Sequence, residues 1–521
     1  MPRPGRKLLP LENPETARQR FAWLVRATRA CHRDIEMRNT ELFSSLLSGF
    51  LEEDLKPATV NRLENGDLEF TIERCRGYEK ALGLEPDMLL SVYLYTFREE
   101  GVPPRGSHVR HRTADAEDLE LMFRLGRGDE LHPIEWLKLS FLYHNNPELI
   151  TRSRTLQVAF FEGILHASSL SYEKDQQIMR EAIINVGDDL APYIAEAAAQ
   201  DSVRNFTAVE ALGHMPGADS WTSLFTLIDQ MEDTWMTHAI LDSVMRRTTD
   251  SQTLRHLGDR EHRQIFDRSM VLVTDPSALF IARESAFEFI RSAHLPPSPR
   301  QRRSMDACRP DLQQLQVFPS STRREDVLQH IIDGTEAALR DNRQSEDIPL
   351  RLPGLKRIVK EGVFSPARMH RISIGVLLSS WNQVNPLSDA IGRTLVSVPN
   401  SEYGLQRSIV RLLTKMGSPE MYRHFRKVQR KAIYDENTML SIAWALGMGS
   451  DPEDISTLTN MYAQARGPET KRAISTAAFR RSNRDLLLKI SEDSDSTVSR
   501  AAKAALRDLP TVKPSTGTTP A

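Results

Sequence analysis

The segment KPATVNRLENGDLEFTIERCRGYEKALGL, residues Lys56–Leu84, decides how the N-terminal part of this chain folds. Val60 and Leu63 lie three residues apart, so a helix over about Pro57–Asn65 turns both side chains into a core. The opposite side of the same helix then faces outward. Its outward side chains are Thr59, Asn61 and Arg62. The segment therefore predicts a short helix with one apolar side and one polar side.

Two glycines mark where the helices of this segment end. Gly66 and Gly83 can adopt the positive φ that closes a helix C-terminus, which predicts one helix ending at Asn65 and another ending near Leu84. Over about residues 15–98, this pattern resembles the Cro/C1-type (XRE) helix-turn-helix family. In that family the corresponding helix lies in the major groove of DNA, so the resemblance implies a DNA-binding N-terminal domain.

The resemblance also implies which side chains contact DNA. Residues near the N-terminus of the Pro57–Asn65 helix reach base edges and phosphates in this motif, and the preceding helix, expected at Asn39–Leu47, begins nearby. The implied DNA-binding residues are Lys56, Thr59, Asn61, Arg62, Arg38, Asn39 and Thr40. The sequence departs from the family between these helices, where Ser48–Leu55 replaces the usual tight turn.

The composition limits where such binding occurs. The 521 residues include 68 basic and 70 acidic side chains, a net charge of −2, so the chain as a whole is not a polycation. Residues 1–40 are different, with nine basic and four acidic side chains. This local excess of +5 lies where a surface facing phosphates would need it.

The length indicates several domain-sized units, and most segments after the N-terminal region are amphipathic at helical spacing. We therefore expect an all-α protein, with an N-terminal helix-turn-helix domain joined to a long HEAT-like α-solenoid. The expected boundaries are a disordered basic arm at 1–12, the XRE-type domain at 13–98, a linker at 99–116, HEAT-like repeats at 117–294, a Pro/Arg-rich loop or hinge at 295–310, further repeats at 311–509 and a disordered tail at 510–521.

A repeat of about 32 residues supports the α-solenoid. Ser418, Ser450 and Ser482 each follow an expected helix at this spacing. Two columns of apolar residues share the register, one formed by Leu378, Val410, Ile442 and Ile474, the other by Trp381, Leu413, Ala445 and Ala477. A period of this length is typical of a two-helix solenoid unit.

The sequence contains no pattern that predicts an enzyme. It lacks the phosphate-binding loop GxxxxGK followed by Ser or Thr, the GxSxG elbow and the HExxH zinc motif. Its three cysteines form no CxxC pair, and His256 and His262 lie six residues apart, which does not place both on one helix face as metal ligands. We therefore expect no catalytic, cofactor-binding or metal-binding residues. No apolar run is long enough for a membrane span or a signal peptide, so we expect a cytoplasmic protein.

These observations favour a sequence-specific transcriptional regulator that binds double-stranded DNA as a homodimer. Its helical repeats are expected to bind a peptide, small-molecule or protein effector, as in the peptide-sensing bacterial regulators that join such a DNA-binding domain to TPR repeats. One alternative is a protein-interaction scaffold that uses the helix-turn-helix for docking. Another is a HEAT-like DNA glycosylase, which needs a basic stripe along the repeats. The paired arginines of this chain are interspersed with acids, which indicates solvated faces instead.

Overall fold

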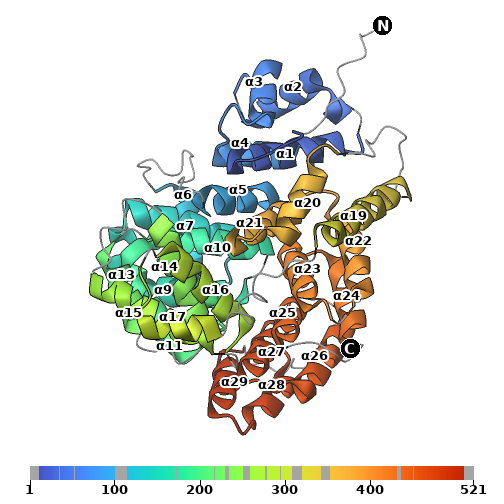
Figure 1. Cartoon of the computed structure of the whole chain (residues 1–521). Coiled ribbons are helices and arrows are strands. Elements are labelled where there is room, and N and C mark those ends of the chain that lie inside the picture. Colours follow the sequence, from blue (N-terminus) through green and yellow to red (C-terminus); the bar gives the residue numbers. More distant parts are fainter. Residues whose placement is uncertain are drawn as a thin grey trace, which may run out of the picture. The chain divides into compact units, whose positions relative to one another are not determined.

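The structure is a computed structural model, and it is helical throughout the described part of the chain (Figure 1). It describes residues 11–509 except for 35, 52, 100–113, 172, 216, 229–233, 250–258, 276–277, 294, 308–319, 342–351, 400, 431–435 and 450. No strand occurs among these residues, which confirms the predicted all-α class. The predicted arm, linker and tail lie mostly outside the described residues, as do Ser450 and His256.

The chain forms two compact units, residues 1–433 and 434–521. The predicted repeat region at 311–509 therefore contributes to both units. The boundary follows the end of helix α24 (Pro419–Arg430) and precedes the start of helix α25 (Glu436–Leu446).

The first unit begins with five α-helices and one 3-10 helix. They are α1 (Ala17–Ala30), η1 (Glu36–Arg38), α2 (Thr40–Leu51), α3 (Pro57–Glu64), α4 (Ile72–Ala81) and α5 (Met88–Glu99); we call them the N-terminal helices. The helix predicted at 57–65 is confirmed as α3, with Val60 and Leu63 fully buried. Gly66 and Gly83 adopt the expected positive φ, 76° and 57°.

Helix α2 extends further than the sequence predicted. It runs to Leu51 rather than Leu47, because Leu51 packs against Gly77 of α4, where a Cβ would meet the leucine side chain at 2.7 Å. The Ser48 hydroxyl donates to Ser44 O and accepts from the N–H of Leu55. The connection between α2 and α3 is consequently shorter than the sequence suggested.

The N-terminal helices do not stand apart from the rest of their unit. Trp23 Nε1 of α1 donates to Pro353 O at 2.8 Å, and its ring centroid lies 6.0 Å from that of Trp381. Further hydrogen bonds join Asn382 to Thr28 O and Ser380 to Met88 O, at 2.9 and 2.6 Å. Helix α5 packs on both α10 (Glu173–Val186) and α21 (Arg368–Ser379). The segment is thus held between early and late helices of the unit.

The remaining helices follow in pairs. In the first unit they are α6 (Ala116–Arg127), α7 (Pro133–Asn145), α8 (Glu148–Thr151), α9 (Arg154–Leu170), η3 (Gly187–Leu190), α11 (Ala191–Gln200), α12 (Phe206–Leu212), α13 (Ala218–Ile228), α14 (Thr234–Thr249), α15 (Asp259–Thr274), α16 (Phe280–Ser292), α17 (Pro299–Ala307), α19 (Ser321–Asp341), α20 (Leu355–Phe364), α22 (Val384–Ser397) and α23 (Tyr403–Met416). Helices α10, α12, α14 and α16 pack consecutively, and α21 packs on α23.

The second unit continues the same alternation. Its helices are α25, α26 (Pro452–Gln464), α27 (Pro468–Arg480), α28 (Arg484–Ser491) and α29 (Ser496–Asp508). Helix α27 packs on both α25 and α29. The residues of the two predicted apolar columns are buried on or directly after α21, α23, α25 and α27, so the 32-residue spacing falls on one helix in every two.

The predicted loop at 295–310 is partly wrong, because residues Pro299–Ala307 form helix α17. Ser298 and Gln301 form a capping box at its start: the N–H of each residue donates to the side chain of the other, at 2.7 and 3.3 Å. Pro299 occupies the first helical position, where its missing N–H costs nothing. The prolines that suggested an interruption therefore mark a helix start. No helix of the described part is long and apolar enough to cross a membrane.

Candidate nucleic-acid interface and buried ionic cluster

Four of the predicted DNA-binding residues lie together on the outward side of α3. Lys56, Asn61 and Arg62 are exposed and Thr59 is half-buried. None of these four side chains makes a hydrogen bond or ion pair with another described residue. Lys56 is the N-cap of α3 and Pro57 follows at the first helical position; the carbonyl oxygen of Lys56 accepts from the N–H groups of Thr59 and Val60, at 2.8 and 3.3 Å.

The other three predicted residues lie where α2 begins, and their side chains are engaged within the fold. Asn39 Oδ1 accepts from the N–H of Glu41 at 2.9 Å and so caps α2. The Arg38 guanidinium donates to His32 O at 2.7 and 3.1 Å. Thr40 Oγ1 accepts from the buried guanidinium of Arg29 at 3.3 Å. The side chains of these three residues make hydrogen bonds that fix the start of α2. The four side chains on α3 make no such bonds and are available to another molecule.

A buried ion pair determines how α3 lies against α1. Arg29 of α1 and Glu64 of α3 are both fully buried, and Nε and Nη2 of the arginine donate to the two carboxylate oxygens at 2.7 Å. Arg29 Nη1 also donates to the carbonyl oxygens of Met37 and Arg38, at 3.0 and 3.2 Å. One guanidinium therefore connects α1, η1, the start of α2 and the end of α3.

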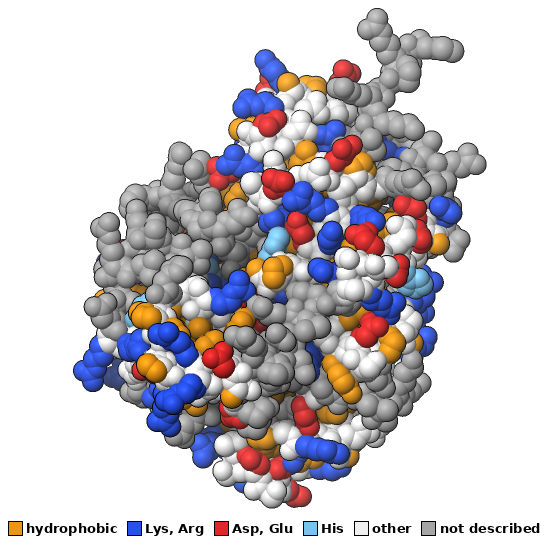
Figure 2. All heavy atoms as spheres, viewed as in Figure 1, with side chains coloured by type: hydrophobic (Ala, Val, Ile, Leu, Met, Phe, Trp, Pro, Cys, Tyr) orange, Lys and Arg blue, Asp and Glu red, His pale blue; other side chains and the backbone are white. Residues whose placement is uncertain are grey.

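Several of the basic residues described between positions 11 and 40 are engaged inside the fold. Arg20 pairs with Glu361 at 3.5 Å, Arg29 pairs with Glu64, and Arg26 donates to Asn65. Figure 2 shows basic and acidic side chains interspersed over the visible face of the N-terminal helices rather than a single basic stripe. The positive charge that remains for a polyanion is concentrated on few side chains.

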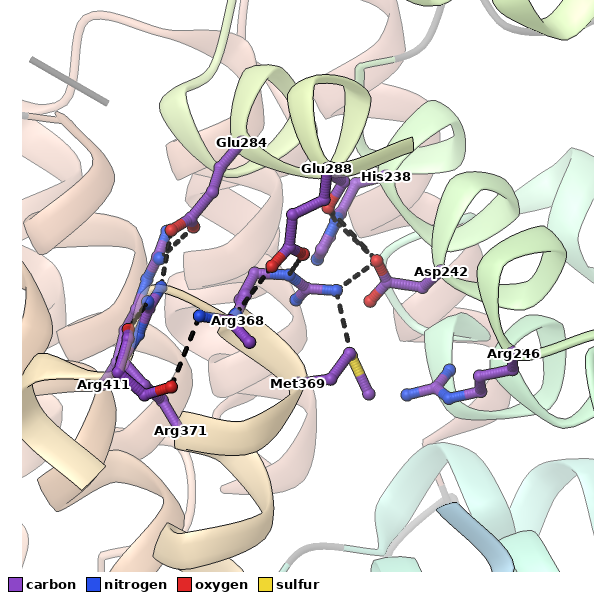
Figure 3. Close-up of polar contacts among 12 residues, drawn as sticks. His238, Asp242, Arg246, Glu284, Glu288, Arg368, Met369, Arg371 and Arg411 are labelled. Atoms are coloured by element: carbon purple, nitrogen blue, oxygen red, sulfur yellow. Dashed lines mark hydrogen bonds and ion pairs between the residues drawn. The ribbon is translucent and has the colours of Figure 1, made fainter. Parts of the chain in front are cut away.

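A second set of charged residues, the ionic cluster, joins four helices of the first unit (Figure 3). It consists of His238 and Asp242 from α14, Glu284 and Glu288 from α16, Arg368 and Arg371 from α21, and Arg411 from α23. Arg246 of α14 lies nearby and pairs with Glu210 at 2.9 Å. Arg368 pairs with Asp242 and with Glu288, the latter at 3.8 Å. Arg371 Nη2 contacts Glu284 Oε1 at 2.5 Å, and Arg411 contacts the other oxygen of the same carboxylate.

The arginines of the ionic cluster keep Glu284 ionised. Burial alone would raise the pKa of Glu284, but the guanidinium groups of Arg411 and Arg371 outweigh it and lower that pKa to about 2. Burial lowers the pKa of His238 well below its usual value, so this imidazole is neutral, and its Nδ1 lies 2.8 Å from Ser285 Oγ. A carboxylate paired in this way is a poor proton acceptor. Burial raises the pKa of Glu288, although the Arg368 guanidinium opposes this shift. Through these pairs the cluster ties α14 and α16 to α21 and α23.

Sequence reasoning missed both the Arg29–Glu64 pair and the ionic cluster. The signal for the pair was present, since Arg29 lies four residues after Val25 on the apolar side of its helix, and Glu64 directly follows Leu63. The cluster had no local signal, because its members come from distant helices; Glu284 and Arg411 are 127 residues apart.

The described residues contain no group of three or more His, Cys, Asp or Glu side chains that could hold a metal ion. Cys31 and Cys75 are buried, and burial raises the pKa of Cys31 to about 12, which disfavours a thiolate nucleophile. No known family model, curated protein or solved structure matches this chain. The resemblance to the XRE family therefore stays a prediction.

Glu64→Ala should destabilise the protein by about 3–5 kcal/mol, because it leaves the buried Arg29 guanidinium without its counter-charge. Chemical denaturation followed by circular dichroism measures this change. Glu53→Ala is the matched control, since Glu53 is half-exposed and pairs with Arg74 at 3.0 Å; its loss should cost about 0–1 kcal/mol. Equal effects of the two substitutions would contradict the central role of the buried pair.

Stability should depend on pH through Glu284. Its folded-state pKa of about 2 lies below the unfolded value of about 4.3, so its contribution is complete above pH 4.3 and is lost as the pH falls toward 2. Glu284→Gln should therefore lower the thermal midpoint strongly at pH 7 and much less at pH 3. The control is Glu120→Gln on the exposed side of α6, which should change neither midpoint. A deficit of the same size at both pH values would show that Glu284 acts by packing alone.

Proposed function

We propose that this protein is a transcriptional regulator that binds double-stranded DNA through α3. The observation that carries the proposal is the outward side of α3, where Lys56, Thr59, Asn61 and Arg62 are free of internal contacts. Recognition in the major groove requires a short helix with two different sides. Its inner side packs on the domain, and its outer side carries polar residues. Helices α2 and α3 then correspond to the helix-turn-helix of the XRE family, and the five N-terminal helices to its whole domain.

The chemistry of the four side chains supports this assignment. Arg62 suits a phosphate or the O6 and N7 atoms of guanine, and Asn61 suits the N6 and N7 atoms of adenine. Thr59 can contact either a base edge or a thymine methyl group. Lys56, an exposed cation at the start of α3, suits a phosphate. The set thus combines contacts that position the helix with contacts that read sequence.

The helix pairs that follow support a HEAT-like α-solenoid as the regulatory part. Successive alternate helices pack on one another, and the 32-residue register continues through both units. In this proposal the repeats dimerise the protein or bind an effector. A homodimer would present two copies of α3 to a palindromic operator.

A specific observation favours the scaffold as the second candidate. Leu42, Leu46 and Phe50 form an apolar stripe along α2, with exposed fractions of 49%, 36% and 43%. The acids Glu41 and Asp54 lie near its two ends, and α2 carries no basic residue. By charge complementarity this stripe fits an amphipathic helix of a partner protein with basic residues beside its apolar face. Phosphate groups of DNA would be repelled there.

Alanine substitution of Lys56, Thr59, Asn61 and Arg62 together should abolish specific DNA binding without changing the thermal midpoint. Each lost base contact costs about 1–3 kcal/mol, so the combined loss exceeds a hundredfold in affinity. Genome-wide immunoprecipitation of the native protein and the variant measures the effect. Arg62→Ala alone should weaken binding to all sequences and reduce the salt slope by about one unit.

The matched control for this experiment is the triple serine variant of Leu42, Leu46 and Phe50. It should retain the DNA peaks if the regulator proposal holds. Native protein without specific peaks, together with a basic helical partner lost only in the triple serine variant, would instead establish the scaffold.

A further inference from the structure

A cavity of about 160 Å³ is lined by residues of α4, α6 and α7. Its apolar wall includes Ile72 of α4 and Leu137 and Leu142 of α7, all three of which are buried. An engineered protein cavity of about 150 Å³ with an apolar lining binds benzene, so this volume admits one ring or a branched chain of similar size.

One polar group at this cavity has unused hydrogen-bonding capacity. The Arg76 guanidinium makes no hydrogen bond with the described residues, and Nε lies 4.0 Å from its ionic partner Asp87, beyond hydrogen-bond distance. The neighbouring polar groups are engaged. Lys138 Nζ pairs with Glu117, and Asn145 Nδ2 donates to Phe141 O at 2.9 Å. The lining also includes the carboxylate of Asp118, whose Oδ2 accepts from the N–H of Asp115 at 3.0 Å in the cap of α6.

We propose that this cavity binds a small organic carboxylate with an apolar body. The carboxylate would pair with Arg76, whose planar fork of N–H donors matches two carboxylate oxygens. The ring or branched chain would then contact Ile72, Leu137 and Leu142 and remove apolar surface from water. A neutral hydrocarbon would leave the Arg76 guanidinium without a partner. A small inorganic anion would leave the apolar wall uncovered. The site therefore favours a carboxylate that carries an apolar group.

The position of the cavity also suggests what the ligand regulates, a step that rests on the proposed function. Arg76 lies on α4, and the next residue, Gly77, touches α2 so closely that a Cβ there would meet Leu51 at 2.7 Å and Leu47 at 3.1 Å. Because no space separates α4 from α2, a ligand that shifts α4 also shifts α2 and α3. The carboxylate is therefore an effector of DNA binding.

Titration calorimetry on the full chain without DNA tests the site, with benzoate, phenylacetate and 4-methylpentanoate as probes. At least one should bind with 1:1 saturation, and the neutral isostere benzamide should bind at least tenfold more weakly than benzoate if benzoate is that ligand. Arg76→Gln should weaken carboxylate binding at least tenfold, whereas Lys80→Gln, an exposed cation on the same helix, should change nothing. No saturable binding of any probe, or equal affinity of the native protein and Arg76→Gln, would overturn the proposal.

The comparison of each bound carboxylate with its neutral amide uses the native protein, so it decides the matter even if the Arg76 variant is unstable. A second measurement separates the site from the function, namely DNA affinity with and without the bound carboxylate, where a change of about fivefold or more is expected. Carboxylate binding through Arg76 without any DNA binding would refute the regulator and leave the site standing. If the protein binds DNA and its DNA affinity is the same with and without the bound carboxylate, the effector role is refuted.

Discussion

The orientation of α3 depends on the buried ion pair between Arg29 and Glu64. Both side chains are fully buried, so moving α3 relative to α1 would leave a charge in the apolar core without a partner. Since α1 is itself tied to residues beyond position 350 through Trp23, the outer side of α3 is positioned by contacts that span most of the first unit. A recognition surface held in this way needs little ordering when it binds.

The ionic cluster applies the same principle to later helices of the first unit. Arg368, Arg371 and Arg411 are used inside the unit, where they join helices that are distant in sequence. Buried pairs of this kind add little net stability but disfavour other packings, because each alternative would separate the charges. Basic residues that are paired internally add little to the potential outside the protein, which limits unspecific attraction of nucleic acids.

Local patterns predicted the parts of the fold that depend on local spacing. Val60, Leu63 and Gly66 indicated α3 nearly to the residue, and the 32-residue columns identified alternate helices. The ionic cluster, the contact of Trp23 with Trp381 and the cavity at Arg76 were not predictable, since each joins residues from distant segments. The basic excess of residues 1–40 was expected on a surface that faces phosphates, but Arg29, which belongs to it, is fully buried. Prolines likewise suggested a loop where Pro299 begins α17.

Two of the contacts between the N-terminal helices and later helices of the first unit differ in physical character. On one side, Trp381 and Asn382, just after α21, pack directly on α1, with Trp381 fully buried. The N-terminus of α21 is tied into the ionic cluster through Arg368, so this contact has charge pairs at one end and packed rings at the other. On the other side, α4 faces α6 and α7 across a cavity and carries Arg76. Close-packed interfaces resist small displacements, whereas a cavity can be filled or emptied. A signal that reaches α3 is therefore expected to enter through α4, with the α21 contact as the fixed support.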